Sequence, residues 1–89
     1  MSEMTREVTI RNTKGLHVRA ATVLAKTAAR YQASVTIAHN GEVVDAKSIM
    51  GLLLLTAARG TRIVVRARGD DAAQAVDAIG ELVEAGFHE

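Results

Sequence analysis

The chain has 89 residues with a formal net charge of +1, and 48% of its residues are hydrophobic. A chain of this length can bury one core, so we expect a single domain over residues 1–89. The small net charge argues against a nucleic-acid partner, and the absence of cysteine excludes disulfides and thiol chemistry. The three scattered histidines lack metal-ligand spacing, so we expect neither a metal nor another cofactor.

The sequence shows no signal for a membrane or for export. It has no run of about 18 apolar residues that would predict a membrane span. The first residues, Met1-Ser2-Glu3-Met4, lack the basic-then-apolar order of a signal peptide. We therefore expect a cytoplasmic monomer that does not insert into membranes.

A strand and a helix come first along the chain. Val8 and Ile10 alternate with polar residues over positions 6–11, which predicts a half-buried strand. A helical pattern follows over residues 18–31. Its spacing predicts five positions that face the core, namely Ala20, Leu24, Thr27, Ala28 and Tyr31.

A hairpin is expected next. Val35 and Ile37 mark a second strand, and residues 42–44 mark a third. Asn40-Gly41, between them, is the preferred dipeptide for a two-residue type I′ turn, because both of its residues tolerate positive φ.

A short second helix should follow the hairpin. Ser48 suits the N-cap of a helix that runs to about residue 57, where Arg59-Gly60 would end it. A run of four leucines on one helix cannot be wholly exposed. We therefore expect that most of Leu52, Leu54 and Leu55 lie in the core.

A fourth strand and a third helix complete the chain. The strand should place Ile63, Val65 and Ala67 on one face. After it, Asp71-Ala72-Ala73-Gln74 fits a capping box at the start of the last helix. Apolar residues then carry this helix to Gly86, and they are Ala72, Val76, Ile79, Leu82 and Val83.

The order β-α-β-β-α-β-α predicts an α+β fold. Because one hairpin joins two strands and helices make the other connections, we expect an open-faced β-sandwich, a four-stranded antiparallel sheet with three helices on one face. The other face can contact water, and it would carry Glu7, Thr9, Arg11, Arg62, Arg66 and Arg68. These arginines do not predict RNA binding, because the chain has only one tyrosine and one phenylalanine for base stacking.

The segment Gly15-Leu16-His17-Val18-Arg19 lies where the first strand gives way to the first helix. The first turn of a helix favours a bound anion, because its backbone N–H groups are unpaired and the helix dipole is positive there. Stability alone does not explain His17 at this point, since N-caps favour Ser, Asp, Asn and Thr. Imidazole is a good nucleophile, and Arg19 offers donors for phosphoryl oxygens. We therefore hypothesise reversible phosphorylation of His17.

These residues carry a resemblance. Gly15-Leu16-His17-Val18-Arg19-Ala20-Ala21 is similar to the active-site motif Gly-Leu-His-Ala-Arg-Pro-Ala of the HPr family, the histidine-containing phosphocarriers of the bacterial phosphoenolpyruvate-dependent sugar phosphotransferase system. Lys47-Ser48-Ile49-Met50-Gly51 resembles the regulatory-serine motif of that family. Together with the order of the elements, the resemblance covers nearly the whole chain.

The resemblance implies a phosphoryl relay. Enzyme I, charged by phosphoenolpyruvate, would pass its phosphoryl group to Nδ1 of His17, where Arg19 would help to hold it. A sugar-specific IIA component would then take the group, so the protein would be a substrate at both steps and not a free-standing enzyme. Partners would dock on an apolar patch beside His17, formed by Ile49, Met50 and Leu53 with Thr22 and Lys26.

The same resemblance makes Ser48 a regulatory site as well as an N-cap. A phosphate added there by an HPr serine kinase/phosphorylase would lie in the docking patch, repel acidic partner groups and slow transfer to His17. Val18 and Ala20 depart from the small residue and the proline of the family motif. They leave open a nitrogen-branch or regulatory paralogue that controls a kinase or transcription factor. From another class, a small ligand-sensing domain shares the βαββαβ core.

Overall fold

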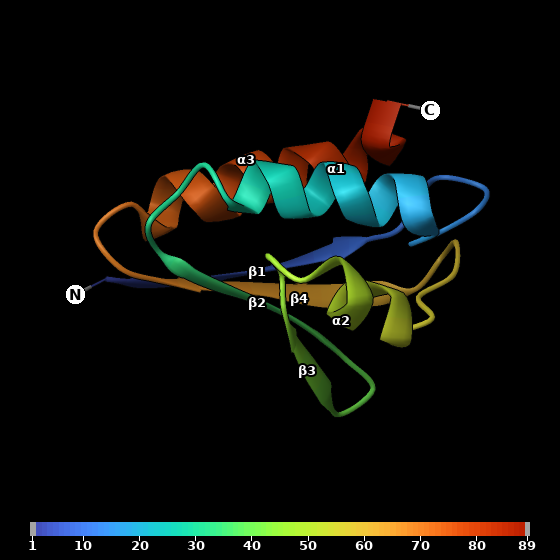
Figure 1. The fold of residues 1–89 in the computed structure, drawn as a ribbon, viewed down its shortest axis with the longest axis horizontal. Helices are drawn as coiled ribbons and strands as arrows, with labels where there is room; N and C mark the ends of the chain where they lie inside the picture. The colour runs from blue at the N-terminus through green and yellow to red at the C-terminus, as the bar shows by residue number, and fades with distance from the viewer. Residues whose placement is uncertain (1, 89) are drawn as a thin grey trace.

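The computed structural model describes residues 2–88 and has the element order expected from the sequence (Figure 1). In chain order the elements are β1 (Glu3–Thr9), α1 (Val18–Ala28), β2 (Ser34–His39), β3 (Glu42–Asp45), α2 (Ile49–Leu54), β4 (Arg62–Arg68), α3 (Ala72–Glu84) and a 3₁₀ turn, η1 (Gly86–His88). None of the helices within residues 2–88 is long and apolar enough to cross a membrane.

Across residues 2–88 the strands form one antiparallel sheet in the order β1-β4-β2-β3. β4 lies between β1 and β2, so Val65 is paired with Arg6 on one side and with Ile37 on the other. β2 turns into β3 through Asn40 and Gly41, whose φ angles of 54° and 84° are the positive values that a type I′ turn requires. The predicted sheet and its hairpin are confirmed.

The three helices and the inner face of the sheet share one core. α1 and α3 lie side by side over one face of the sheet, and α2 packs against α1 and β3 (Figure 1). Large side chains that are fully buried in this core come from both layers and include Leu24, Ile37, Leu52, Ile63 and Ile79. The arrangement is the predicted open-faced sandwich.

The opposite face of the sheet is polar, as predicted. The exposed arginines of β4 on this face are Arg62, Arg66 and Arg68. Arg62 forms an ion pair with Glu7 at 3.5 Å. The placement of Arg11 on this face was wrong, because β1 covers Glu3–Thr9 and not positions 6–11. Arg11 therefore lies in the loop that leads to α1.

Two helices end earlier than predicted. α1 ends at Ala28, so Tyr31 lies in the following turn and is half-buried. Thr27, which the spacing placed in the core, is also half-buried. α2 ends at Leu54 and not near residue 57, because Thr56 takes a φ of 49° and leaves the helical conformation.

Asp71 is the N-cap of α3, but its side chain makes no bond to that helix. Its carboxylate accepts hydrogen bonds from the N–H groups of Gln32 (2.9 Å) and Ala33 (2.8 Å), in the connection between α1 and β2. The bond from Gln32 is the main cause that lowers the pKa of Asp71 below its ordinary value of 3.8. The predicted capping box was therefore wrong, since the carboxylate holds a loop that is distant in sequence.

Candidate functional site

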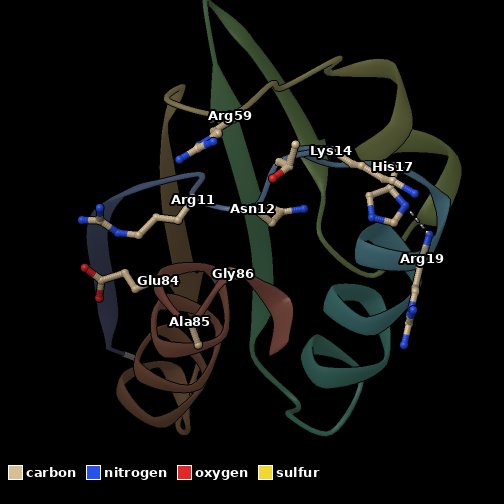
Figure 2. Close-up of a pocket in the computed structure, with 10 residues that line it drawn as sticks. Arg11, Asn12, Lys14, His17, Arg19, Arg59, Glu84, Ala85 and Gly86 are labelled. Atoms are coloured by element: carbon tan, nitrogen blue, oxygen red, sulfur yellow. Dashed lines mark hydrogen bonds between the residues drawn. The ribbon is translucent and has the colours of Figure 1, made fainter. Parts of the chain in front are cut away.

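His17 is the N-cap residue of α1. Its backbone is extended (φ −81°, ψ 178°), and its carbonyl accepts a hydrogen bond from the N–H of Ala21 at 2.9 Å. The ring atom Nδ1 accepts from the backbone N–H of Arg19 at 3.3 Å (Figure 2). The imidazole thus performs the capping that Ser or Asp usually provides, while the residue remains partly exposed.

The loop before His17 is held in place from two directions. Asn12 is buried, and its side-chain amide donates to the carbonyl of Gly15 at 2.8 Å. The N–H of Leu16 donates to the carbonyl of Ala57 at 2.9 Å, which ties the loop to the segment between α2 and β4. At Gly15 the φ is 64°, and an added Cβ would lie 2.4 Å from the Ala57 oxygen. Glycine is therefore required here, and the position of the imidazole is set by the loop.

Nδ1 is the ring nitrogen that faces the N-terminus of α1. Because Nδ1 accepts a hydrogen bond, this geometry assigns the proton of the neutral ring to Nε2 and directs the lone pair of Nδ1 at the Arg19 N–H. A phosphoryl group on Nδ1 would meet the same N–H and the positive end of the helix. The exposed side chain of Arg19 can add further donors. The arrangement suits a nucleophile that becomes an anion after reaction.

A pocket of about 610 Å³ opens beside His17 (Figure 2). It is lined by loop residues 11–14, His17, Arg19, Arg59 and residues 84–86. Four of these residues are cations, namely Arg11, Lys14, Arg19 and Arg59. Among residues 2–88, no group of three or more His, Asp or Glu side chains is placed to hold a metal ion. The charge of the pocket suits an anion.

From the sequence we predicted only Arg19 beside His17. The other three cations of this pocket were not predicted. Arg11 and Lys14 lie before α1, and Arg59 lies in the loop between α2 and β4. The hydrogen bonds of Ile10 with Thr61 (2.9 Å) and with Gly60 (2.8 Å) bring these two loops together. No sequence pattern predicts that these two loops lie close together, because their contact depends on the pairing of β1 with β4.

The residues expected to contact partners lie on α1 and α2, which pack against each other. On α2, Met50 is 70% exposed and Ile49 is 37% exposed, whereas Leu53 is half-buried against the core. On α1, Lys26 is exposed, and the hydroxyl of the half-buried Thr22 donates to the carbonyl one turn earlier at 2.7 Å. Met50 therefore presents the largest exposed apolar fraction among the predicted docking residues.

The prediction that most of Leu52, Leu54 and Leu55 are core is confirmed, with Leu54 as the exception. Leu52 and Leu55 are buried as expected, but Leu54 is 69% exposed. It lies four residues after Met50, so the two side chains share one face of α2. We refer to the three exposed residues of this helix, Ile49, Met50 and Leu54, as the α2 patch. Val18, at the first position of α1, is also exposed and was not assigned to docking from the sequence.

Ser48 is the N-cap of α2, as predicted. Its hydroxyl oxygen accepts from the N–H of Gly51 at 3.0 Å, and the residue is half-buried. It directly precedes Ile49 and Met50, so a group attached to its oxygen would lie next to the α2 patch.

Comparison with known proteins identifies the class to which this fold and site belong. Residues 4–85 match the family described as the PTS HPr component phosphorylation site. The chain belongs to the HPr family of phosphocarriers of the phosphotransferase system.

Individual relatives agree with this assignment over nearly the full chain. The phosphocarrier protein HPr of Xylella fastidiosa is 45% identical over 83 residues, which cover 93% of each chain. The phosphocarrier protein NPr of Shewanella violacea is 44% identical over 89 residues, which cover 100% of this chain and 98% of the relative. The crystal structure of an HPr from Thermoanaerobacter tengcongensis superposes with a TM-score of 0.90 at 35% identity, covering 100% of this chain and 98% of that chain.

Proposed function

We propose that this chain, acting as a cytoplasmic monomer, accepts a phosphoryl group from enzyme I on Nδ1 of His17 and passes it to IIA components of sugar permeases. The observation that carries the proposal is the hydrogen bond between Nδ1 and the first turn of α1. It aims the nucleophilic lone pair at the place where a helix N-terminus stabilises an anion.

The transfer steps use this geometry directly. In the first step the Nδ1 lone pair attacks the phosphorus atom, the N–P bond forms, and the bond from phosphorus to enzyme I breaks with its electron pair left on enzyme I. In the second step a nucleophile of the IIA component attacks phosphorus, and the electron pair of the N–P bond returns to Nδ1. The Arg19 guanidinium and the α1 backbone hold the phosphoryl oxygens in both steps, so catalysis is positioning and charge stabilisation.

Both partners would contact the α2 patch. Exposed apolar side chains at one helix face suit a docking site, and methionine adapts to more than one surface. Lys26 lies exposed on α1 and would attract an acidic partner during encounter. Thr22 and Leu53 would contribute to the base of the same contact.

Ser48 would regulate this contact. A phosphate on its hydroxyl adds about 1.5 to 2 negative charges at pH 7. These charges would lie beside Ile49 and Met50 and would repel acidic groups of the docking partner. An HPr serine kinase/phosphorylase would be the enzyme that adds and removes the group. Transfer to His17 would slow while the fold stays intact.

A second assignment within the family differs only in the acceptor. The HPr of Xylella fastidiosa and the NPr of Shewanella violacea are 45% and 44% identical to this chain, so identity does not favour one class of carrier over the other. The alternative is a nitrogen-branch or regulatory carrier whose acceptor controls a kinase or a transcription factor. Incubation of the phosphorylated protein with purified acceptors of each branch separates the two, since the true acceptor removes the phosphoryl group fastest.

The primary test is phosphorylation of the purified protein by enzyme I from the same organism, with magnesium and labelled phosphoenolpyruvate. Wild type should gain an acid-labile, base-stable phosphoryl group, and His17→Ala should gain none. His39→Ala is the matched control, because His39 lies at the end of β2 and should leave labelling unchanged. Absence of label on folded wild type, or label that persists in His17→Ala, would refute the proposal.

A further inference from the structure

The pocket beside His17 carries more positive charge than the capture of one phosphoryl group requires. Arg11 and Lys14 come from the loop before α1, Arg19 from α1 itself, and Arg59 from the loop before β4. Within the described residues 2–88, none of these four cations forms an ion pair. Four like charges that line one concavity repel each other, so they favour a bound counter-anion.

The acid on the wall of this pocket offsets little of that charge. Among the described residues that line the pocket, Glu84 is the only one with a carboxylate, and its side chain already pairs with the guanidinium of Arg6. Arg6 is held in this position by α3, where a Cβ on Gly80 would lie 2.7 Å from the Arg6 Nη1 atom. The charge of Glu84 is therefore balanced by Arg6, so it does not neutralise the four cations of the pocket.

The four cations are divided between two ends of the pocket. In the close-up, Lys14 and Arg19 lie on the same side as His17, whereas Arg11 and Arg59 lie on the other side, with Asn12 and Gly86 between them (Figure 2). The volume of about 610 Å³ is within the range of small-molecule sites. A ligand that spans the pocket can thus meet a pair of cations at each end.

We propose that this pocket binds a small organic phosphate that carries a second anionic group. Its phosphate would bind between Arg11 and Arg59, because guanidinium groups match phosphate oxygens with paired donors. Its second anionic group would lie toward Lys14 and Arg19. A small ligand fits this place better than a protein partner does, because none of the described residues that line the pocket has a large apolar side chain, whereas the α2 patch does.

The site would be coupled to the chemistry of His17. A phosphoryl group on Nδ1 occupies the end of the pocket that holds Lys14 and Arg19, so it competes with the second anionic group of the ligand. Coupling is reciprocal, so the ligand would also disfavour phosphorylation. This coupling rests on the proposed function of His17, whereas the binding itself does not.

Binding is measured on the unphosphorylated full chain by calorimetry and by backbone amide shifts, so a failure of phosphorylation cannot mask it. The probes are 3-phosphoglycerate, glycerol 3-phosphate and inorganic phosphate. We expect saturable binding of 3-phosphoglycerate with shifts at residues 11–14 and 59, and weaker binding of the two probes that lack the carboxylate. Equal affinity for all three would overturn the two-ended site.

Two double variants remove the same charge from different places. R11Q/R59Q should raise the Kd for 3-phosphoglycerate by about tenfold or more, and R66Q/R68Q, on the open face of the sheet, should leave it unchanged. Equal loss in both would mean that the protein attracts anions only through its overall charge, which contradicts a site. Tighter binding of a poly-glutamate peptide than of 3-phosphoglycerate, lost in R11Q/R59Q, would assign the pocket to an acidic protein instead.

Discussion

The side-chain amide of Asn12 donates to the carbonyl oxygen of Gly15 at 2.8 Å, across the turn that ends just before His17. The same oxygen also accepts from the backbone N–H of His17 at 3.0 Å. One carbonyl therefore links a buried side chain to the backbone of the residue that we propose as the phosphoryl acceptor.

Replacement of Asn12 by alanine should loosen this turn. Asn12→Ala removes a buried donor, so we expect the free energy of unfolding to fall by about 1–2 kcal/mol. Phosphorylation by enzyme I should slow at a temperature where the variant is fully folded, because the imidazole is less well positioned. Urea denaturation and initial rates of labelling check the two effects. An unchanged rate would show that the turn serves stability alone.

Gly15→Ala should be far more harmful than the same change at Gly60. Both glycines have positive φ, 64° and 88°, but an added Cβ meets the Ala57 oxygen at 2.4 Å only at Gly15 and meets nothing within 4 Å at Gly60. Gly60→Ala should cost about 1–2 kcal/mol from backbone strain, and Gly15→Ala should cost more than about 3 kcal/mol. Denaturation of both variants under one set of conditions gives the comparison, and equal losses would contradict the contact with Ala57.

Arg19→Gln should impair transfer without affecting the fold. The side chain is exposed, so thermal stability should stay close to wild type. The rate of phosphorylation by enzyme I should fall by about 10²-fold if the guanidinium stabilises the phosphoryl oxygens. Arg30→Gln, just after the other end of α1, is the matched loss of charge and should keep the wild-type rate. A similar decrease in both variants would reduce the role of Arg19 to general attraction.

The α2 patch should determine the affinity for partners. Met50→Ser combined with Leu54→Ser should raise the KM for the protein as substrate of enzyme I by about tenfold, with an unchanged Tm, because both residues are mostly exposed. Val43→Ser removes a side chain of similar exposure, 65%, from β3 and serves as the control. If the control raises KM as much as the double variant does, partners do not dock on α2.

Asp71 should make the fold sensitive to acid. Its pKa is lowered in the folded state, chiefly by the hydrogen bond from Gln32, so its contribution to stability is present above the unfolded-state pKa. That contribution is lost as the pH falls through the lower, folded-state pKa. The Tm difference between wild type and Asp71→Ala should therefore be largest at neutral pH and shrink below about pH 4. A difference that grows on acidification would contradict this account.

Much of the fold follows from local patterns in the sequence. Alternation at Val8 and at Ile63, the Asn40-Gly41 turn and the Ser48 cap all predict the elements that form, because each depends on neighbours within a few residues. His17 could likewise be selected from the sequence, since a histidine at a helix start is unusual for stability alone.

What could not be predicted depends on contacts between distant segments. Asp71 has the spacing of a capping box, yet its carboxylate accepts hydrogen bonds from the N–H groups of Gln32 and Ala33 in the turn between α1 and β2. Leu54 is exposed because it shares the outer face of α2 with Met50, whereas Leu52 faces the core. Arg59 reaches the pocket of His17 because β1 pairs with β4 and Leu16 bonds to Ala57.

That pairing also fixes the order in which the molecule can become active. The N–H of Leu16 donates to the carbonyl of Ala57, and within residues 2–88 the strand β1 pairs only with β4, which ends at residue 68. Contacts between such distant segments form late, since the entropy of closing the long loop is lost before they stabilise the chain. A nascent chain that extends only to residue 56 already contains the complete segment from Gly15 to Arg19, but it lacks the Ala57 carbonyl and the strand β4 that support this segment in the fold. The histidine that we propose as the phosphoryl acceptor is synthesised early, and its loop is supported only when β4 has been synthesised and paired with β1.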